Sequence, residues 1–255
     1  MPETARDETK QRKVLQEEFE RAAAGFAERT KGRFDDMGAV EFSRVTPGAS
    51  VLEVGAGTGN FLSLFSEVAG SLVAVDLTHG MLAEARRRDP AIKAAQGEGA
   101  LLPLQTASFD LVTTAQALHH ISRPVPVLQD MRRVMKREGA LLLVDQVSTE
   151  SYEQAAFMNE MEVIRDPSHA MSRPPSAMRI IVRSAGFDIV EEKLWTGTNT
   201  FSKWMWPGEF PEERIAAVRS FVERFGAETG MGFERDGDDF VFTRRRIMIL
   251  ARRSL

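Results

Sequence analysis

The stretch Val51-Leu-Glu-Val-Gly-Ala-Gly-Thr-Gly-Asn60 decides the fold of this chain. Its apolar start predicts a short buried strand, and its glycines predict a tight turn that opens a helix. Because glycine lacks a Cβ, Gly55 can turn the chain sharply and Gly57 can leave bare backbone for a ligand. Gly59 would let the helix begin close to the sheet, with its free N–H groups facing a polar or anionic ligand.

The spacing of the glycines separates this loop from a dinucleotide-binding turn. That fingerprint is G-x-G-x-x-G, whereas Gly55, Gly57 and Gly59 alternate. Glu53 lies inside the preceding strand, and Asp76 ends the next apolar run. An acidic residue at the end of a second strand, about 20 residues downstream, suits the two hydroxyls of a ribose. A generic glycine turn in another α/β protein is the less favoured alternative.

Composition narrows the class of protein. The 255 residues suit one large domain. No apolar run approaches the ~20 residues of a membrane span, and the charged N-terminus lacks the apolar core of a signal peptide. Without cysteine there is no disulfide, thiolate nucleophile or cysteine-ligated zinc. The net charge of −4 disfavours a nucleic-acid binder. We therefore expect a cytoplasmic monomer or homodimer with a small-molecule partner.

Short apolar strands alternate with amphipathic helices through the middle of the chain. This alternation indicates a parallel sheet covered on both faces, with ligands bound beyond the carboxyl ends of the strands. The glycine loop, Asp76, Glu98 and Gln116 all fall at such ends. The pattern predicts strands at 51–54, 72–76, 92–96, 109–114 and 140–145, and helices at 60–68, 78–88 and 122–136, the last ended by Gly139.

Toward the two ends of the chain, strands and helices no longer alternate regularly. We predict a single domain over residues 1–255 with an N-terminal helical region, 1–46, and two cap-like insertions, 148–180 and 196–237. The pattern predicts further helices at about 7–29, 148–164, 175–185 and 211–225, and strands at 187–195 and 240–252.

Several motifs together resemble one family, the class I S-adenosylmethionine (SAM) dependent methyltransferases of the ubiquinone/menaquinone-biosynthesis type, which are methyltransferase domain 11-like. They are the glycine loop, Asp76–Arg86, Gly97-Glu-Gly-Ala-Leu-Leu-Pro-Leu104, Ser108-Phe-Asp-Leu-Val112 and Ala117-Leu-His-His-Ile121. The resemblance implies a Rossmann-like, doubly wound α/β fold. It also implies a seven-stranded sheet, mostly parallel with an antiparallel last strand, and helical insertions after strands five and six.

The resemblance also implies SAM as cofactor, S-adenosylhomocysteine (SAH) as product, and no metal. Asp76 would take the ribose hydroxyls, Leu77 would pack against adenine, and Glu53 would lie near the methionine end. Relatives usually carry Asp at the position of Glu98, and often Arg or Asn at that of Gln116. The implied cofactor-binding set is Glu53, Gly55, Ala56, Gly57, Gly59, Asp76, Leu77, Met81, Glu98, Gly99 and Gln116.

For methyl transfer from a sulfonium, the protein mainly aligns the acceptor with the methyl group and excludes water. It needs no nucleophilic side chain. A base is needed only if the acceptor must lose a proton, and histidine suits that work. We take His120 and His169 as the catalytic candidates. The alternatives are structural: His119 and His120 could bond loop backbone, and His169 could order its loop by bonding Asp166.

Aromatic residues supply the substrate candidates, Phe26 and Trp204, with Trp206 nearby. Phe26 stands where relatives commonly have Tyr, and core packing is the alternative for the tryptophans. The adjacent histidines and the lack of a carboxylate cluster disfavour a metal site. The leading hypothesis is a SAM-dependent methyltransferase acting on a small organic acceptor at O, C or N. The alternative is a noncatalytic SAM-binding scaffold or sensor.

Overall fold

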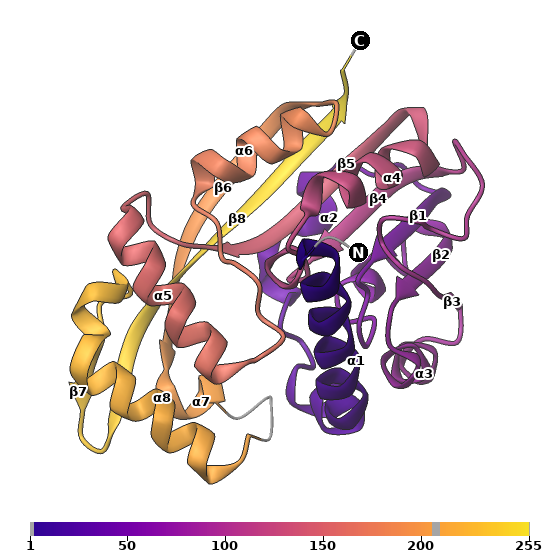
Figure 1. Cartoon of the computed structure of the whole chain (residues 1–255). Helices are drawn as coiled ribbons and strands as arrows, with labels where there is room; N and C mark the ends of the chain where they lie inside the picture. Colours follow the sequence, from indigo (N-terminus) through magenta and orange to yellow (C-terminus); the bar gives the residue numbers. More distant parts are fainter. Residues whose placement is uncertain (1–2, 206–209, 255) are drawn as a thin grey trace.

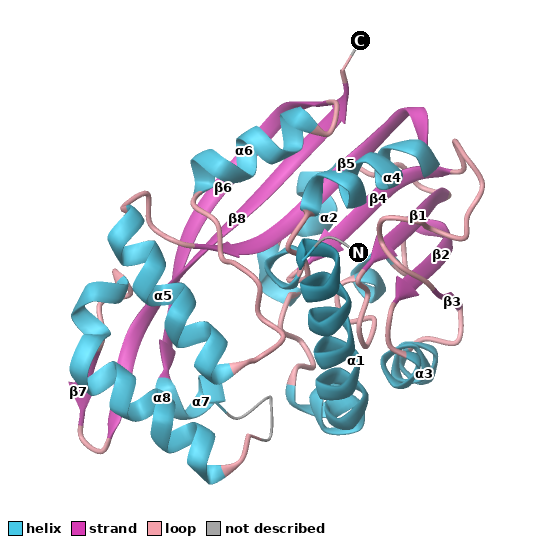
Figure 2. Ribbon diagram, in the orientation of Figure 1, coloured by secondary structure: helices cyan, strands magenta, loops and turns pink. Residues whose placement is uncertain are grey.

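The computed structural model describes residues 3–205 and 210–254, with side chains described from residue 9 onward. An eight-stranded sheet with helices on both faces forms the body of the molecule (Figures 1 and 2). Its strands are β1 Ala49–Val54, β2 Ala69–Asp76, β3 Ile92–Gln96, β4 Phe109–Ala115, β5 Met135–Val147, β6 Phe187–Thr200, β7 Glu234–Asp236 and β8 Asp239–Arg253.

The helices fall into two groups. The α-helices are α1 Glu3–Arg29, α2 Ala39–Ser43, α3 His79–Arg88, α4 Pro124–Val134, α5 Tyr152–Arg165, α6 Pro175–Ser184, α7 Phe201–Met205 and α8 Glu212–Phe225. The 3₁₀ turns that matter for the site are η2 Leu62–Phe65 and η3 Leu118–His120.

The strand order is β3-β2-β1-β4-β5-β8-β6, with β7 paired to β8. Strands β1 to β5 are parallel, and β8 runs antiparallel between β5 and β6. The predicted Rossmann-like sheet with an antiparallel last strand is therefore confirmed, with the short β7 as an additional strand. Because the chain crosses from β3 back to β4 beside β1, the switch point lies between β1 and β4, where such sheets bind ligands.

Alternate side chains of β1 enter two different cores. Leu52 and Val54 pack on the face covered by α4 and α6, whereas Val51 packs on the face that carries Phe61 and Leu82. This alternation follows from the pleat of a strand. Burial on both faces explains why apolar residues stand side by side at Val51 and Leu52 instead of alternating with polar ones.

A third hydrophobic cluster lies apart from the sheet centre, where α5, α7 and α8 gather over the far ends of β6 and β8 (Figure 1). It joins both predicted insertions, because Met158 and Met161 of the first pack with Phe201 and Trp204 of the second. We call this group of elements the cap.

Two predicted helices are wrong in form. The helix expected at 60–68 is only the 3₁₀ turn η2, since Phe61, Leu62 and Phe65 are buried against the sheet and the chain enters β2 at Ala69. The helix expected to run to residue 136 ends at Val134. Strand β5 then begins at Met135, so Gly139 lies inside a strand instead of ending a helix.

Candidate functional site

A cavity of about 490 Å³ opens where β1, β2 and β4 end. Its lining includes every residue of the predicted cofactor-binding set except Gly59. It also includes Phe26 and His120. The sheet contributes one wall, α1 a second, and the cap a third through Arg165, Phe210 and Arg244.

The glycine loop presents backbone to this cavity. Gly55 has φ +71° and a Cβ there would lie 2.7 Å from the Cβ of Ala117, so a side chain would collide. Gly57 has φ +52° and open space around its missing Cβ. Gly59 instead packs against Ala85, at 3.1 Å from a notional Cβ. The loop therefore offers bare backbone at Gly57, while Gly59 serves packing and no α-helix N-terminus follows it.

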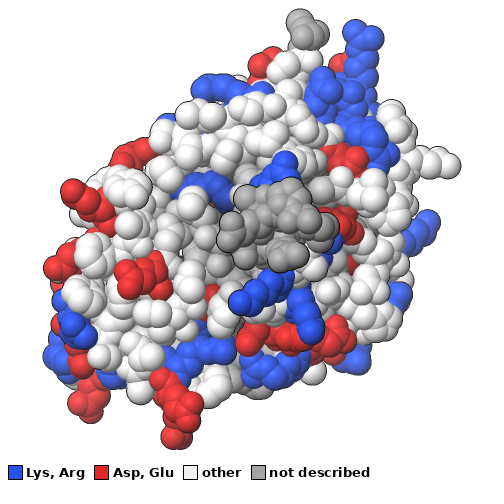
Figure 3. Space-filling view, viewed as in Figure 1, with Lys and Arg blue, Asp and Glu red and all other residues white. Residues whose placement is uncertain are grey.

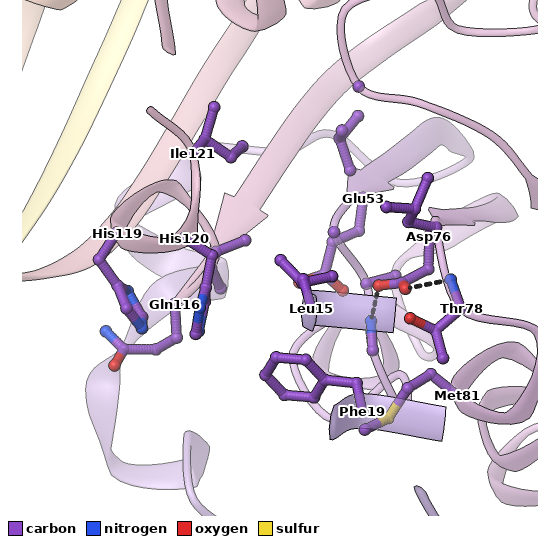
Figure 4. Close-up of a pocket in the computed structure, with 18 of the residues that line it drawn as sticks. Leu15, Phe19, Glu53, Asp76, Thr78, Met81, Gln116, His119, His120 and Ile121 are labelled. Atoms are coloured by element: carbon purple, nitrogen blue, oxygen red, sulfur yellow. Dashed lines mark hydrogen bonds between the residues drawn. The ribbon is translucent and has the colours of Figure 1, made fainter. Parts of the chain in front are cut away.

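Asp76 fastens the glycine loop to the end of β2. Its carboxylate accepts a hydrogen bond of 2.8 Å from the N–H of Gly57 and one of 2.9 Å from that of Thr78 (Figure 4). Burial raises the pKa of Asp76, and these hydrogen bonds oppose the rise. The carboxylate is thus held at the rim of the cavity by donors from two loops.

Several residues that line the cavity carry a buried polar atom without a partner in the described chain. On the sheet side these atoms are Glu53 Oε2, Thr78 Oγ1 and Gln116 Nε2. Burial raises the pKa of Glu53 well above its usual range, and the charge of Asp76 adds to the effect. Gln116 also has φ 54°, a strained value for a residue with a side chain. Buried polar groups are normally paired, so these atoms indicate a site for a polar ligand.

Helix α1 closes the cavity on one side. Gln16 Nε2 donates to the carbonyl of Leu77 at 3.1 Å, and the carboxylate of Glu20 accepts from the N–H of Gly80 at 3.0 Å. Arg12 pairs with Glu98 at 2.6 Å, so Glu98 already has a cationic partner. In Figure 4, Leu15 and Phe19 of α1 lie between the Asp76 side and the histidine side.

The best-supported base in the cavity is His119. Its Nδ1 lies 2.6 Å from Asp145 Oδ1, and its backbone N–H donates to Oδ2 at 3.0 Å. Burial raises the pKa of Asp145 to about 6. Burial, followed by the charges of His120 and His169, holds the pKa of His119 well below its usual range. Near pH 7, a neutral imidazole therefore donates Nδ1–H to a carboxylate and keeps a lone pair on Nε2.

The other two predicted histidines differ in their placement. His120 lines the cavity, with Nδ1 3.0 Å from Ser168 Oγ and its ring edge-on to Phe19. His169 is outside the main cavity, behind His119, and its Nε2 lies 2.8 Å from Asn159 Oδ1. The partner expected for a structural His169 was Asp166, and only the backbone N–H of His169 bonds that residue.

Trp204 also lies elsewhere than predicted. It exposes 2% of its surface and packs inside the cap against Phe201 and Phe242. It does not line the cavity, because the face of its ring is covered by the guanidinium of Arg165. Trp206 falls outside the described residues.

The sequence reasoning missed three arginines at the cap end of the cavity: Arg33, Arg165 and Arg244. They come from the loop after α1, the end of α5 and β8. Neighbouring arginines of β8 differ in placement, since Arg244 lines the cavity and Arg245 instead bonds the carbonyl of Gly230.

Comparison with known proteins now adds to this geometry. Residues 52–143 match the family model described as "Methyltransferase domain". This segment, about a third of the chain, is similar to methyltransferase domains. It holds the glycine loop, Asp76, Gln116 and both cavity histidines, so the family match covers the sheet side of the site.

Individual proteins extend the likeness. The chain is 28% identical over 208 residues to the uncharacterized methyltransferase YcgJ of Bacillus subtilis, covering 78% of this chain and 82% of the relative. It is 36% identical over 111 residues to a demethylmenaquinone methyltransferase of Renibacterium salmoninarum, covering 44% of each. The crystal structure of a candidate methyltransferase from Bacillus halodurans superposes with a TM-score of 0.79 at 25% identity, covering 87% of this chain and 100% of that one.

The surface of the molecule carries mixed charge. On the face seen in Figure 3, basic and acidic side chains are interspersed. Among the described residues, no three histidine, aspartate or glutamate side chains gather as metal ligands would. No helix in the described part of the chain is long and apolar enough to span a bilayer.

Proposed function

We propose that this chain transfers a methyl group from SAM to the O, C or N atom of a small organic acceptor and releases SAH. The observation that carries the proposal is the set of buried, unpartnered atoms around bare Gly57 beside Asp76. A carboxyl, a hydroxyl and an amide group face one cavity, and these suit the polar groups of a ribose and an amino acid.

The residues present fit SAM in three parts. Asp76 would take the ribose hydroxyls, as an acidic residue does at this place in related nucleotide sites. Leu77 and Met81 supply apolar surface for an adenine, while Glu53 and Gln116 face the amino-acid end. When bound, SAM would supply an electrophilic methyl group on a positively charged sulfur.

The work of the chain is then positioning and exclusion of water. Helix α1 and the cap wall the cavity, and alignment of two reactants is worth about 7–11 kcal/mol in favourable cases. His119, held by Asp145, would accept the proton of an acceptor hydroxyl, amine or acidic carbon at Nε2. His120 stands beside it as a second candidate, while His169 does not line the cavity and its ring centre lies 5.8 Å from that of His119.

The proposed acceptor is a small molecule, supported by the net charge of −4 and the mixed charge of the surface. A cytoplasmic location, the absence of a metal, and a monomeric or homodimeric state stay predictions from the sequence.

Calorimetry with SAM and SAH tests the cofactor. We expect micromolar binding of both, and no binding at high micromolar concentration would contradict the proposal. A turnover screen over phenol, quinol, sterol, amine and acid acceptors, read out as SAH release, tests the reaction. Binding without turnover on every acceptor class would favour the noncatalytic scaffold.

A further inference from the structure

The cap end of the cavity is rich in arginine and poor in carboxylate partners. Arg33 Nη2 donates to Gln116 Oε1 at 3.1 Å, and Arg244 Nη2 donates to Gln146 Oε1. Both partners are neutral amides, and neither arginine has a carboxylate within salt-bridge distance in the described chain. Arg165 alone of the three has an ion pair, with Glu162 at 3.1 Å.

Unpartnered donors converge at the same end. Arg165 Nε and Arg244 Nε are buried and bond nothing among the described residues, and the same holds for Gln116 Nε2, which the proposed function assigns to the cofactor. The Gln116 amide cannot turn to present oxygen here without losing its bond from Arg33. Asp166 also lines this side, but its Oδ1 already accepts from the N–H and Oγ of Ser168. Glu162 Oε1 is a buried acceptor without a partner, but Glu162 does not line the cavity. The buried unpartnered atoms of the residues that line this end are therefore donors, which an oxyanion would satisfy.

The electrostatics of the arginines agree with this geometry. Burial, then the charges of Arg244, Arg246 and Arg165, lowers the pKa of Arg33 to about 9. Burial also lowers the pKa of Arg244 to about 10, although the charge of Glu162 opposes the change. Like charges that lower one another's pKa repel, and a bound anion relieves that repulsion. The electrostatic repulsion among these arginines is thus greatest when no anion is bound.

We propose that Arg165 and Arg244 bind an oxyanion of the methyl acceptor, so that the acceptor is a small acid bearing a carboxylate or a phosphate. This inference rests on the proposed function, because it assigns the cap end of the cavity to the acceptor. The planar guanidinium groups suit either oxyanion through paired N–H donors.

The first test compares matched ligands on the SAH-loaded wild-type protein by calorimetry. The probes are benzoate, phenyl phosphate and the neutral benzamide. We expect at least one of the acids to bind about tenfold or more tighter than benzamide, since hydrogen bonds to charged groups are the stronger kind. The tighter acid identifies the oxyanion. Equal affinity of all three probes, or no binding of either acid, would overturn the proposal.

The second test changes one arginine. Arg244→Met should weaken binding of the preferred acid about tenfold or more and leave benzamide unchanged, and Arg244→Lys should recover part of the loss. Arg245→Met is the matched control, because it removes a neighbouring charge whose side chain bonds Gly230 and does not line the cavity. Equal loss in the Arg244 and Arg245 variants would contradict the inference.

A third measurement separates the acceptor from the cofactor, whose own carboxylate is a rival oxyanion. Arg244→Met should leave SAH affinity within about twofold of wild type, a small change beside the loss of a charged hydrogen bond. A tenfold loss for SAH with none for 5′-methylthioadenosine, which lacks the amino acid, would assign the arginine to the cofactor and overturn the inference. Failure of the wild-type protein to bind SAH would instead contradict the proposed function. The SAH titration comes before any acid is added, so the two failures can be told apart.

Discussion

Asp76 shows how one carboxylate organises two loops, because it accepts from Gly57 and Thr78 together. Asp76→Ala should weaken SAH binding about 10- to 100-fold, since hydrogen bonds to a charged group are lost. Asp110→Ala is a matched control, because Asp110 pairs with Lys136 and does not line the cavity. Calorimetry checks both variants, and equal SAH affinity in the two would remove Asp76 from the site.

Glu53 exposes 1% of its surface, and its carboxyl keeps a raised pKa. A raised pKa means that the folded chain holds a proton that the unfolded chain has released, so the free energy of unfolding falls as pH rises above about 4.3. Glu53→Gln removes this titration. Its melting temperature relative to wild type should therefore be higher at pH 8 than at pH 5, without ligand.

The same Glu53→Gln variant should bind SAH more weakly, because an amide that cannot ionise replaces the ionisable carboxyl that faces the amino-acid end of the cavity. Calorimetric scans at the two pH values and a titration with SAH check both halves. A melting difference that is the same at pH 5 and pH 8 would contradict the assigned direction of the pKa shift.

His119 differs from the other histidines by its bond to Asp145. For a hydroxyl acceptor, His119→Ala should lower kcat about 10²- to 10⁴-fold, the usual contribution of a general base. SAH affinity should change little. His79→Ala is the control, since His79 is exposed and outside the cavity. Steady-state kinetics decide, and equal kcat values in the two variants would remove His119 as the base.

At the scale of elements, α1 is tied over the cavity by polar links that are exposed or only partly buried. They include the hydrogen bonds of Gln11, Gln16 and Glu20 and the Arg12–Glu98 pair. Such elements open at low free-energy cost. Hydrogen exchange of the amides in residues 12–26 should slow when SAH fills the cavity beneath them, while exchange in α4 should not change. Equal exchange in α1 with and without SAH would contradict its role as a wall.

How well each element could be predicted depended on local signals. The strand at 92–96 has the predicted bounds because Pro90 and Gly97 limit it on either side. The helix expected at 60–68 failed because apolar residues at helical spacing also fit a 3₁₀ turn whose side chains enter the sheet core. The apolar periodicity predicts which residues are buried. Tertiary packing decides whether they form an α-helix or a shorter 3₁₀ turn.

The site divides in the same way. Glu53, the glycine loop and Asp76 lie in one βαβ-like stretch with fixed spacing, so the sequence could place them at one edge. Arg33, Arg165 and Arg244 are brought together only by the crossing of α1, the cap and β8, which no local pattern encodes. Trp204 was misplaced for a related reason, because an aromatic residue in an insertion can face either the cavity or the cap core.

At the scale of the whole molecule, the last strand of the sheet in sequence sits inside it rather than at its edge. Strand β8 lies between β5 and β6, and β6 pairs with no other strand in the described chain. Domains fold as units while the chain is made from its N-terminus. During synthesis, β5 and β6 therefore lack their partner strand β8, and remain open edges, until residues 239–253 have left the ribosome. Open strand edges can pair with other chains. A chain that stops before β8 is therefore prone to aggregate. The cavity itself is completed only when translation has reached β8, because that strand carries Arg244.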